Sequence, residues 1–189
     1  GKLMKKRICT LLLALCLTLG LLPAAAQAAG DGSGTFDTVR WTLDADGGLT
    51  VSGTGDLPDS AFAGRTDIVT VTFTGQVARI GRSAFAGCTQ LRRVDGFGAV
   101  TCVMSQAFAG CTALTELAVP GTVAEIGTGA FSACTGLTAV TLAPGVRSLG
   151  AYAFAACTAL RRIDLPDGMT LPGSGLFSGC TALTELPLP

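Results

Sequence analysis

Residues 126–142 read IGTGAFSACTGLTAVTL, and variants of this stretch recur along the chain every 23 residues. Its phenylalanine has an equivalent in each copy: Phe62, Phe85, Phe108, Phe131, Phe154 and Phe177. A cysteine stands three residues after all of these but the first, where Arg65 takes its place. A fixed period of this length is typical of a solenoid, in which stacked copies bury a core that no single copy could bury alone.

The residues after each cysteine carry the strand signal. Leu114-x-x-Leu117-x-Val119 is the apolar skeleton L-x-x-L-x-L of a leucine-rich repeat. Its alternation predicts a strand with one buried side. We therefore predict an α/β repeat solenoid with a parallel β-sheet on one side. The Ala-Phe-x-x-Cys segments are expected to return on the other side as turns or short helices. In the second copy Gly96-Phe97-Gly98 replaces the strand end, so an irregularity is expected there.

Three segments are predicted before the repeats. Residues 1–28 have the basic, apolar and Ala-x-Ala parts of a secretory signal peptide, cleaved near Ala28. A membrane anchor is the alternative, but the apolar run at 8–22 is shorter than the ~20 residues that a span needs. Residues 29–34 are predicted to be a linker and residues 35–56 a β-hairpin cap. Residues 57–189 hold the repeats, and we expect the natural protein to continue beyond them.

Composition limits the partners of the mature chain. Beyond residue 28 the chain has no lysine, nine arginines and 13 acidic residues. Such a chain has little attraction for nucleic acid or for anionic lipid headgroups. It also lacks a second apolar stretch of spanning length, so no membrane span is expected in the mature chain. A secreted or cell-surface location follows from the predicted signal peptide.

Neither catalysis nor a metal site is predicted. The chain has no histidine, which removes the most frequent general base. We therefore predict no enzymatic activity, no catalytic residue and no cofactor. The periodic cysteines are equivalent and cannot all pair, so buried free thiols are favoured over disulfides or a metal site. Cys102 lies outside that series and is expected to be the more exposed, more reactive thiol. Asp44-x-Asp46-Gly47-Gly48 is similar to a calcium loop, but a hairpin turn is the favoured interpretation.

The repeat Ile126-Gly127-x-x-Ala130-Phe131-x-x-Cys134-x-x-Leu137-x-x-Val140-x-Leu142 resembles the BspA-like, or Treponema-type, leucine-rich repeat. The resemblance covers about residues 57–189. Residues 41–55 also resemble the N-terminal region common in such proteins. Family members are typically surface-exposed or secreted proteins of host-associated bacteria. The resemblance therefore implies adhesion to host proteins and cells, and coaggregation.

The exposed side of the predicted strands is the expected binding surface, because repeat solenoids bind along this extended concave face. The alternative is that these charges only solvate the sheet, with Arg93 neutralised by Glu116, and Arg162 by Glu185, in the neighbouring copy. The equivalent positions on the exposed side of the strands hold no Trp or Tyr, so weak or avidity-dependent binding is expected. The candidate residues are Arg92, Arg93, Asp95, Glu116, Thr141, Arg161, Arg162, Asp164 and Glu185.

The functional hypothesis is an adhesin-like module that binds protein ligands, including host extracellular-matrix or cell-surface proteins. Two alternatives stay open. The repeats could be a structural spacer that projects another domain, or an ancillary region of a larger secreted enzyme.

Overall fold

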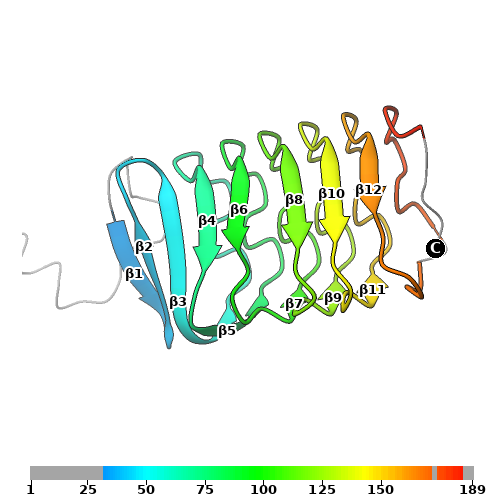
Figure 1. Ribbon diagram of the computed structural model, residues 1–189. Coiled ribbons are helices and arrows are strands. Elements are labelled where there is room, and N and C mark those ends of the chain that lie inside the picture. The colour runs from blue at the N-terminus through cyan, green and yellow to red at the C-terminus, as the bar shows by residue number, and fades with distance from the viewer. Residues whose placement is uncertain (1–31, 172–173, 185–189) are drawn as a thin grey trace, which may run out of the picture.

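The computed structural model describes residues 32–171 and 174–184 of the chain. These residues form a solenoid whose turns contribute strands of three or four residues to one side and, apart from the five-residue β5, strands of two residues to the other (Figure 1). The side here called the long-strand sheet comprises β4 (Thr70–Phe73), β6 (Arg93–Gly96), β8 (Glu116–Val119), β10 (Ala139–Leu142) and β12 (Arg162–Asp164). Its strands form two ladders, because β4 and β6 pair with each other while β8, β10 and β12 pair among themselves. The short-strand sheet comprises β5 (Gln76–Ile80), β7 (Cys102–Val103), β9 (Glu125–Ile126) and β11 (Ser148–Leu149).

Three antiparallel strands precede the parallel turns. They are β1 (Gly32–Phe36), β2 (Val39–Leu43) and β3 (Gly48–Leu57). The long strand β3 joins both sheets, because its first half pairs with β4 and its second half with β5. Residues 32–34, predicted to belong to a linker, form the start of β1 instead. The predicted signal peptide, residues 1–28, lies outside the described residues.

The core is a stack of phenylalanine rings along the solenoid. Phe108 is fully buried, and its ring centroid lies 5.0 Å from that of Phe85 and 5.2 Å from that of Phe131. The interplanar angles of these pairs are 4° and 2°, so the rings lie parallel. The backbone reinforces each step, since the N–H of Phe108 donates to the carbonyl of Ala130 in the next turn. The strict period of the sequence thus becomes a single continuous ladder.

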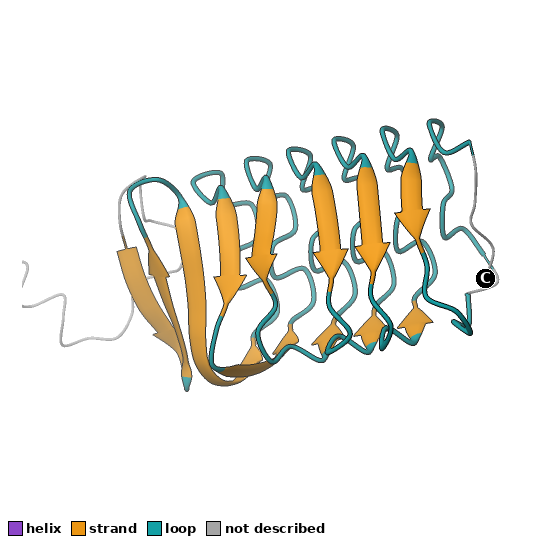
Figure 2. Cartoon of the chain, in the orientation of Figure 1, coloured by secondary structure: helices purple, strands orange, loops and turns teal. Residues whose placement is uncertain are grey.

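The expected short helices are absent from residues 32–171 and 174–184, which contain strands and turns only (Figure 2). The reason lies in the backbone on either side of each phenylalanine. Positions two before and two after it adopt positive φ, as at Gln106 (57°) and Gly110 (71°) around Phe108. An α-helix cannot continue through a left-handed residue, so the segment folds into tight turns.

The expected irregularity in the second copy is confirmed. Pairing between β4 and β6 shifts register between Val71 and Thr72, so that Thr72 faces Gly96. The shift brings Phe97 into the core, where its ring stacks 6.4 Å from that of Phe73. β6 pairs with β4 but not with β8, whereas β8, β10 and β12 form their own in-register ladder.

Candidate protein-binding face

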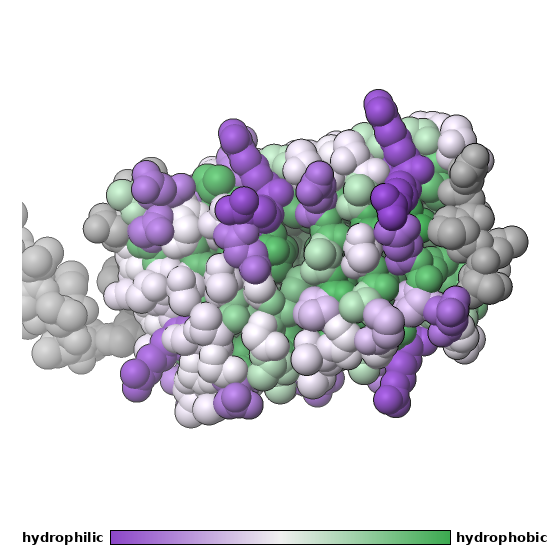
Figure 3. All heavy atoms as spheres, in the orientation of Figure 1, coloured by the Kyte–Doolittle hydropathy of each residue, from purple (hydrophilic) through white to green (hydrophobic). Residues whose placement is uncertain are grey.

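The outward side of the long-strand sheet, here called the binding face, carries most of the sequence-predicted site residues. Figure 3 shows two hydrophilic clusters on this side, near β6 and β12 of Figure 1, with a less polar surface between them. Because side chains of a strand alternate between its two sides, Arg93 and Asp95 of β6 share the outward side, as do Arg162 and Asp164 of β12.

The two clusters have the same composition and the same internal pairing. In β6, Arg93 forms an ion pair with Asp95. In β12, Nε and Nη2 of Arg162 donate to the two carboxylate oxygens of Asp164 at 2.9 and 2.7 Å. The predicted pairing of Arg93 with Glu116 is therefore wrong: the arginine pairs with the aspartate two residues on in its own strand, as Arg162 does in the regular ladder, and β6 does not pair with β8. Glu185, the predicted partner of Arg162, lies outside the described residues.

Each cluster has a second arginine just before the strand. Arg92 and Arg161 are exposed, and their backbones belong to one hydrogen-bonded column. In this column the N–H of Thr115 donates to the carbonyl of Arg92 at 3.5 Å. The N–H of Thr138 donates to the carbonyl of Thr115 at 2.8 Å, and the N–H of Arg161 donates to the carbonyl of Thr138 at 2.9 Å. Residues 92, 115, 138 and 161 are called the arginine–threonine column below.

Small side chains occupy the surface between the two clusters. Ala118 and Thr141 are exposed neighbours across β8 and β10, and Ala139 is half-buried beside them. Glu116 is exposed and faces Ala139 in the ladder. The binding face is therefore a low, nearly neutral floor with a charged cluster at each side.

The periodic cysteines are structural thiols, all buried except the half-buried Cys180. The prediction that they are free is confirmed for the described residues. Each Sγ donates to the carbonyl of the phenylalanine in the preceding turn, as Cys134 does to Phe108 at 3.2 Å. Burial raises the pKa of Cys88 and of Cys134 to about 12 and also raises the pKa of Cys111. These thiols remain protonated at neutral pH and are not nucleophiles.

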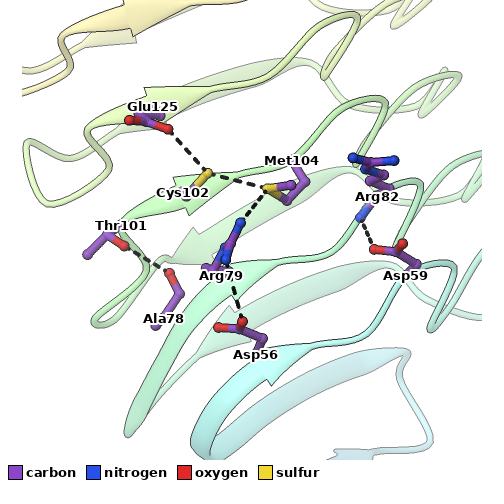
Figure 4. Close-up of polar contacts among 9 residues, drawn as sticks. All are labelled: Asp56, Asp59, Ala78, Arg79, Arg82, Thr101, Cys102, Met104 and Glu125. Atoms are coloured by element: carbon purple, nitrogen blue, oxygen red, sulfur yellow. Dashed lines mark hydrogen bonds and ion pairs between the residues drawn. The ribbon is translucent and has the colours of Figure 1, made fainter.

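Cys102 lies on the outside of the short-strand sheet (Figure 4). It is less buried than Cys88, Cys111, Cys134 and Cys157, as predicted. Its Sγ donates to Sδ of Met104 at 3.6 Å and to a carboxylate oxygen of Glu125 at 3.9 Å. Partial burial and the Glu125 carboxylate raise the pKa of Cys102. The surroundings therefore disfavour the thiolate that a reactive cysteine needs.

The Asp44 loop is a turn, in agreement with the favoured interpretation. One carboxylate oxygen of Asp44 accepts the N–H groups of Asp46 and Gly48 at 2.9 and 2.7 Å. Across residues 32–171 and 174–184, no group of three or more His, Cys, Asp or Glu side chains is placed to hold a metal ion.

One cluster was missed at the sequence level. Arg65 replaces the periodic cysteine in the first turn, and its guanidinium lies 5.5 Å from the ring centre of Trp41. Its Nε also donates to Asp67 at 2.9 Å, and this bond holds the pKa of Asp67 below its usual value. The break in the cysteine series was the available signal. The cluster fastens the antiparallel strands to the repeats.

The sequence model of the BspA-type leucine-rich repeat region matches residues 55–184 in six copies. The chain belongs to the BspA-type leucine-rich-repeat family. Leucine-rich-repeat proteins of this kind are in general protein-interaction modules rather than enzymes.

Two solved structures resemble this BspA-type chain. The leucine-rich-repeat protein TpLRR of T. pallidum has 28% sequence identity and a TM-score of 0.66, over 79% of each chain. A leucine-rich-repeat protein of Bacteroides ovatus has 25% identity and a TM-score of 0.66. That match covers 84% of this chain and 46% of the Bacteroides protein. No curated protein sequence matches the BspA-type chain. Its described part forms no helix that is long and apolar enough to cross a membrane.

Proposed function

We propose that this chain is a secreted or cell-surface adhesin-like module whose binding face docks protein ligands, including host extracellular-matrix or cell-surface proteins. The observation that carries the proposal is the pair of matching charged clusters on the exposed face of a rigid sheet. Arg92, Arg93 and Asp95 form one cluster, and Arg161, Arg162 and Asp164 repeat it three turns further on.

The rigidity of the strands and the small side chains of the binding face support docking of a protein partner. The second cluster is carried by β12, whose inner side chain Ile163 is fully buried, and the strands between the clusters bury Leu117 and Val140. A surface held in place this way loses little conformational entropy when a partner binds. The small floor around Ala118 and Thr141 allows a partner's backbone to approach the sheet. Because the face lacks large aromatic anchors, affinity is expected to come from several weak contacts and from multivalent display.

The test is solid-phase binding of the secreted chain to extracellular-matrix proteins, mucin, epithelial cells and partner bacteria. Ala118→Tyr and Thr141→Tyr place a bulky, neutral side chain with good strand propensity on the floor of the binding face. Ser148→Tyr places the same side chain on the exposed short-strand sheet as a matched control. We expect saturable binding that the first two variants lose and the control retains.

Absence of binding by the folded, multivalently displayed chain would overturn the adhesin proposal and favour a structural spacer. If Ser148→Tyr abolishes binding as strongly as Thr141→Tyr does, the docking surface is not confined to the binding face. The proposed secretion has its own measurement: N-terminal sequencing of the exported protein should find a new terminus directly after Ala28.

A further inference from the structure

The arginine–threonine column holds the backbones of two exposed arginines at a fixed separation. Arg92 and Arg161 stand three steps apart in a continuous series of backbone hydrogen bonds through Thr115 and Thr138. Hydrogen-bonded neighbours in a sheet are ~4.8 Å apart, so the two arginines are separated by ~14 Å along the solenoid. The steps are fixed by the stacking of whole turns, so the separation is a rigid property of the fold.

Both guanidinium groups are available to a partner. The neighbouring arginines, Arg93 and Arg162, are occupied by Asp95 and Asp164 of their own strands. Arg92 and Arg161 are exposed, and neither forms an ion pair with any other residue in 32–171 or 174–184. Among the described residues, each cluster thus presents one arginine in an ion pair and one arginine outside any ion pair.

We propose that the binding face takes an extended peptide segment of a partner protein that carries acidic side chains at positions i and i+4. The segment lies along the solenoid axis over the arginine–threonine column, with one carboxylate at Arg92 and the other at Arg161. The proposal rests on the proposed function, because it specifies the partner of the same face.

The geometry of an extended chain selects this spacing. A strand rises ~3.4 Å per residue, so four residues span ~14 Å and match the separation of the arginines. Side chains an even number of residues apart point to the same side of a strand, so both carboxylates face the sheet. An i, i+3 spacing spans only ~10 Å and turns one of the two carboxylates away.

Neighbouring side chains restrict the path of the segment. Thr115 and Thr138, between the arginines, are short enough to lie beneath the peptide, and the Thr138 hydroxyl already donates to the Thr115 carbonyl at 3.0 Å. Asp95 and Asp164 lie further along the same strands. Their carboxylates repel an acidic segment from that edge and confine it to the arginine–threonine column.

The experiment measures binding of the full chain to surfaces that display short Thr/Ser peptides at high density. One peptide carries glutamates at i and i+4, a second has the same composition with glutamates at i and i+3, and a third has lysines at i and i+4. Sulfated polysaccharide is a fourth surface. The variants are Arg92→Ala, Arg161→Ala, the two combined, and the charge reversal Arg92→Glu/Arg161→Glu. The control is Arg40→Glu, which changes an exposed arginine on β2.

We expect the i, i+4 glutamate peptide to bind best. Removal of either arginine should weaken its binding about threefold, and removal of both about tenfold, as befits exposed ion pairs. The Arg92→Glu/Arg161→Glu variant should lose this peptide and gain the lysine peptide, whereas Arg40→Glu should change neither. The exposed positions keep the fold intact, and an unchanged melting temperature verifies this.

Equal binding of the two glutamate spacings, or no binding of either, would overturn the proposal. So would an exchange of charge at residues 92 and 161 that leaves peptide preference unchanged. Strong binding to sulfated polysaccharide without discrimination between peptides would assign the column to polyanions instead. The proposed function is tested separately from the peptide proposal. If Thr141→Tyr abolishes binding to the protein panel but the charge exchange at residues 92 and 161 does not, the proposed function stands and the peptide proposal fails.

Discussion

Ala133→Gly should stabilise the protein, although it removes a methyl group from the repeat region. The residue two positions after each phenylalanine is left-handed in every described turn, with φ of 71° at Gly87 and Gly110 and 57° at Ala133. For a residue with a side chain, this conformation costs ~1–2 kcal/mol. Glycine avoids that cost but loses ~0.4–1 kcal/mol through the greater freedom of the unfolded chain. The net gain is about 0.5–1 kcal/mol, and the melting temperature should rise by about 1–4 °C.

The measurement is urea and thermal unfolding of the wild-type protein beside two matched variants. Gly110→Ala tests the reverse change. The added Cβ would lie 3.8 Å from Gly87 Cα, an ordinary contact, so the loss of stability reports backbone strain less the gain from a more restricted unfolded chain, with no steric clash. Ala130→Gly removes a fully buried methyl group at a position without positive φ and should destabilise by ~1 kcal/mol. If Ala133→Gly lowers stability as much as Ala130→Gly does, the reasoning from backbone conformation is refuted.

Three other predictions concern the core, the thiols and acid stability. Phe108→Ala removes a fully buried ring from the centre of the stack and should cost ~3–5 kcal/mol in urea unfolding, against little change for the exposed Thr112→Ala. In the folded mature chain, iodoacetamide should modify Cys102 well before Cys111. The reaction of Cys102 should still accelerate as pH rises above 9.0, because its raised pKa keeps the thiol protonated below that pH. Equal rates for the two thiols would contradict their placement. The pKa of Asp67 lies below 3.8, so its pair with Arg65 stabilises the fold above that pH and ceases to do so as pH falls further. In Asp67→Asn this acid-dependent loss should be smaller; an unchanged acid profile would show that the pair contributes nothing.

The solenoid and its buried columns could be predicted from the sequence because one cause fixes both. Each turn contacts only its neighbours, so every buried position must recur at the same spacing. Val140 and Leu142 appear in the sequence as an alternating apolar pair and appear in the structure as the inner side of β10. The free cysteines follow from the same reasoning, since equivalent positions have equivalent surroundings.

The turns could not be predicted with the same success. Glycine occupies the position two after the phenylalanine in several copies, but Ala133 and Ala156 occupy it in others. At the position two before, the left-handed residues include Ser83, Gln106 and Tyr152, which share no chemical type. Stacking hydrogen bonds to neighbouring turns impose the conformation against local preference, so the sequence carried no consistent signal for it.

Two features of the sheets were also beyond the pattern. The short strands β7, β9 and β11 comprise two residues each, too few for a periodic signal. Arg93 and Arg162 each pair with the aspartate two residues on in the same strand, and the spacing of the repeats does not specify this choice. The sequence therefore indicated which residues lie on the outer side of the long strands, but not the ion-pair partner of each arginine.

Each type of hydrogen bond between successive turns always runs in the same direction, and this affects how such a chain can change length. Each Cys Sγ reaches back to the phenylalanine carbonyl of the turn before it, and each Phe N–H reaches forward to the turn after it. Removing or duplicating one 23-residue unit between regular turns would thus join ends that already fit each other. A tandem duplication between β8 and β10 would leave every contact type intact while moving Arg161 one step, ~4.8 Å, further from Arg92. Unequal recombination within the gene could in this way adjust the spacing of surface groups in fixed increments, with no new packing to be selected.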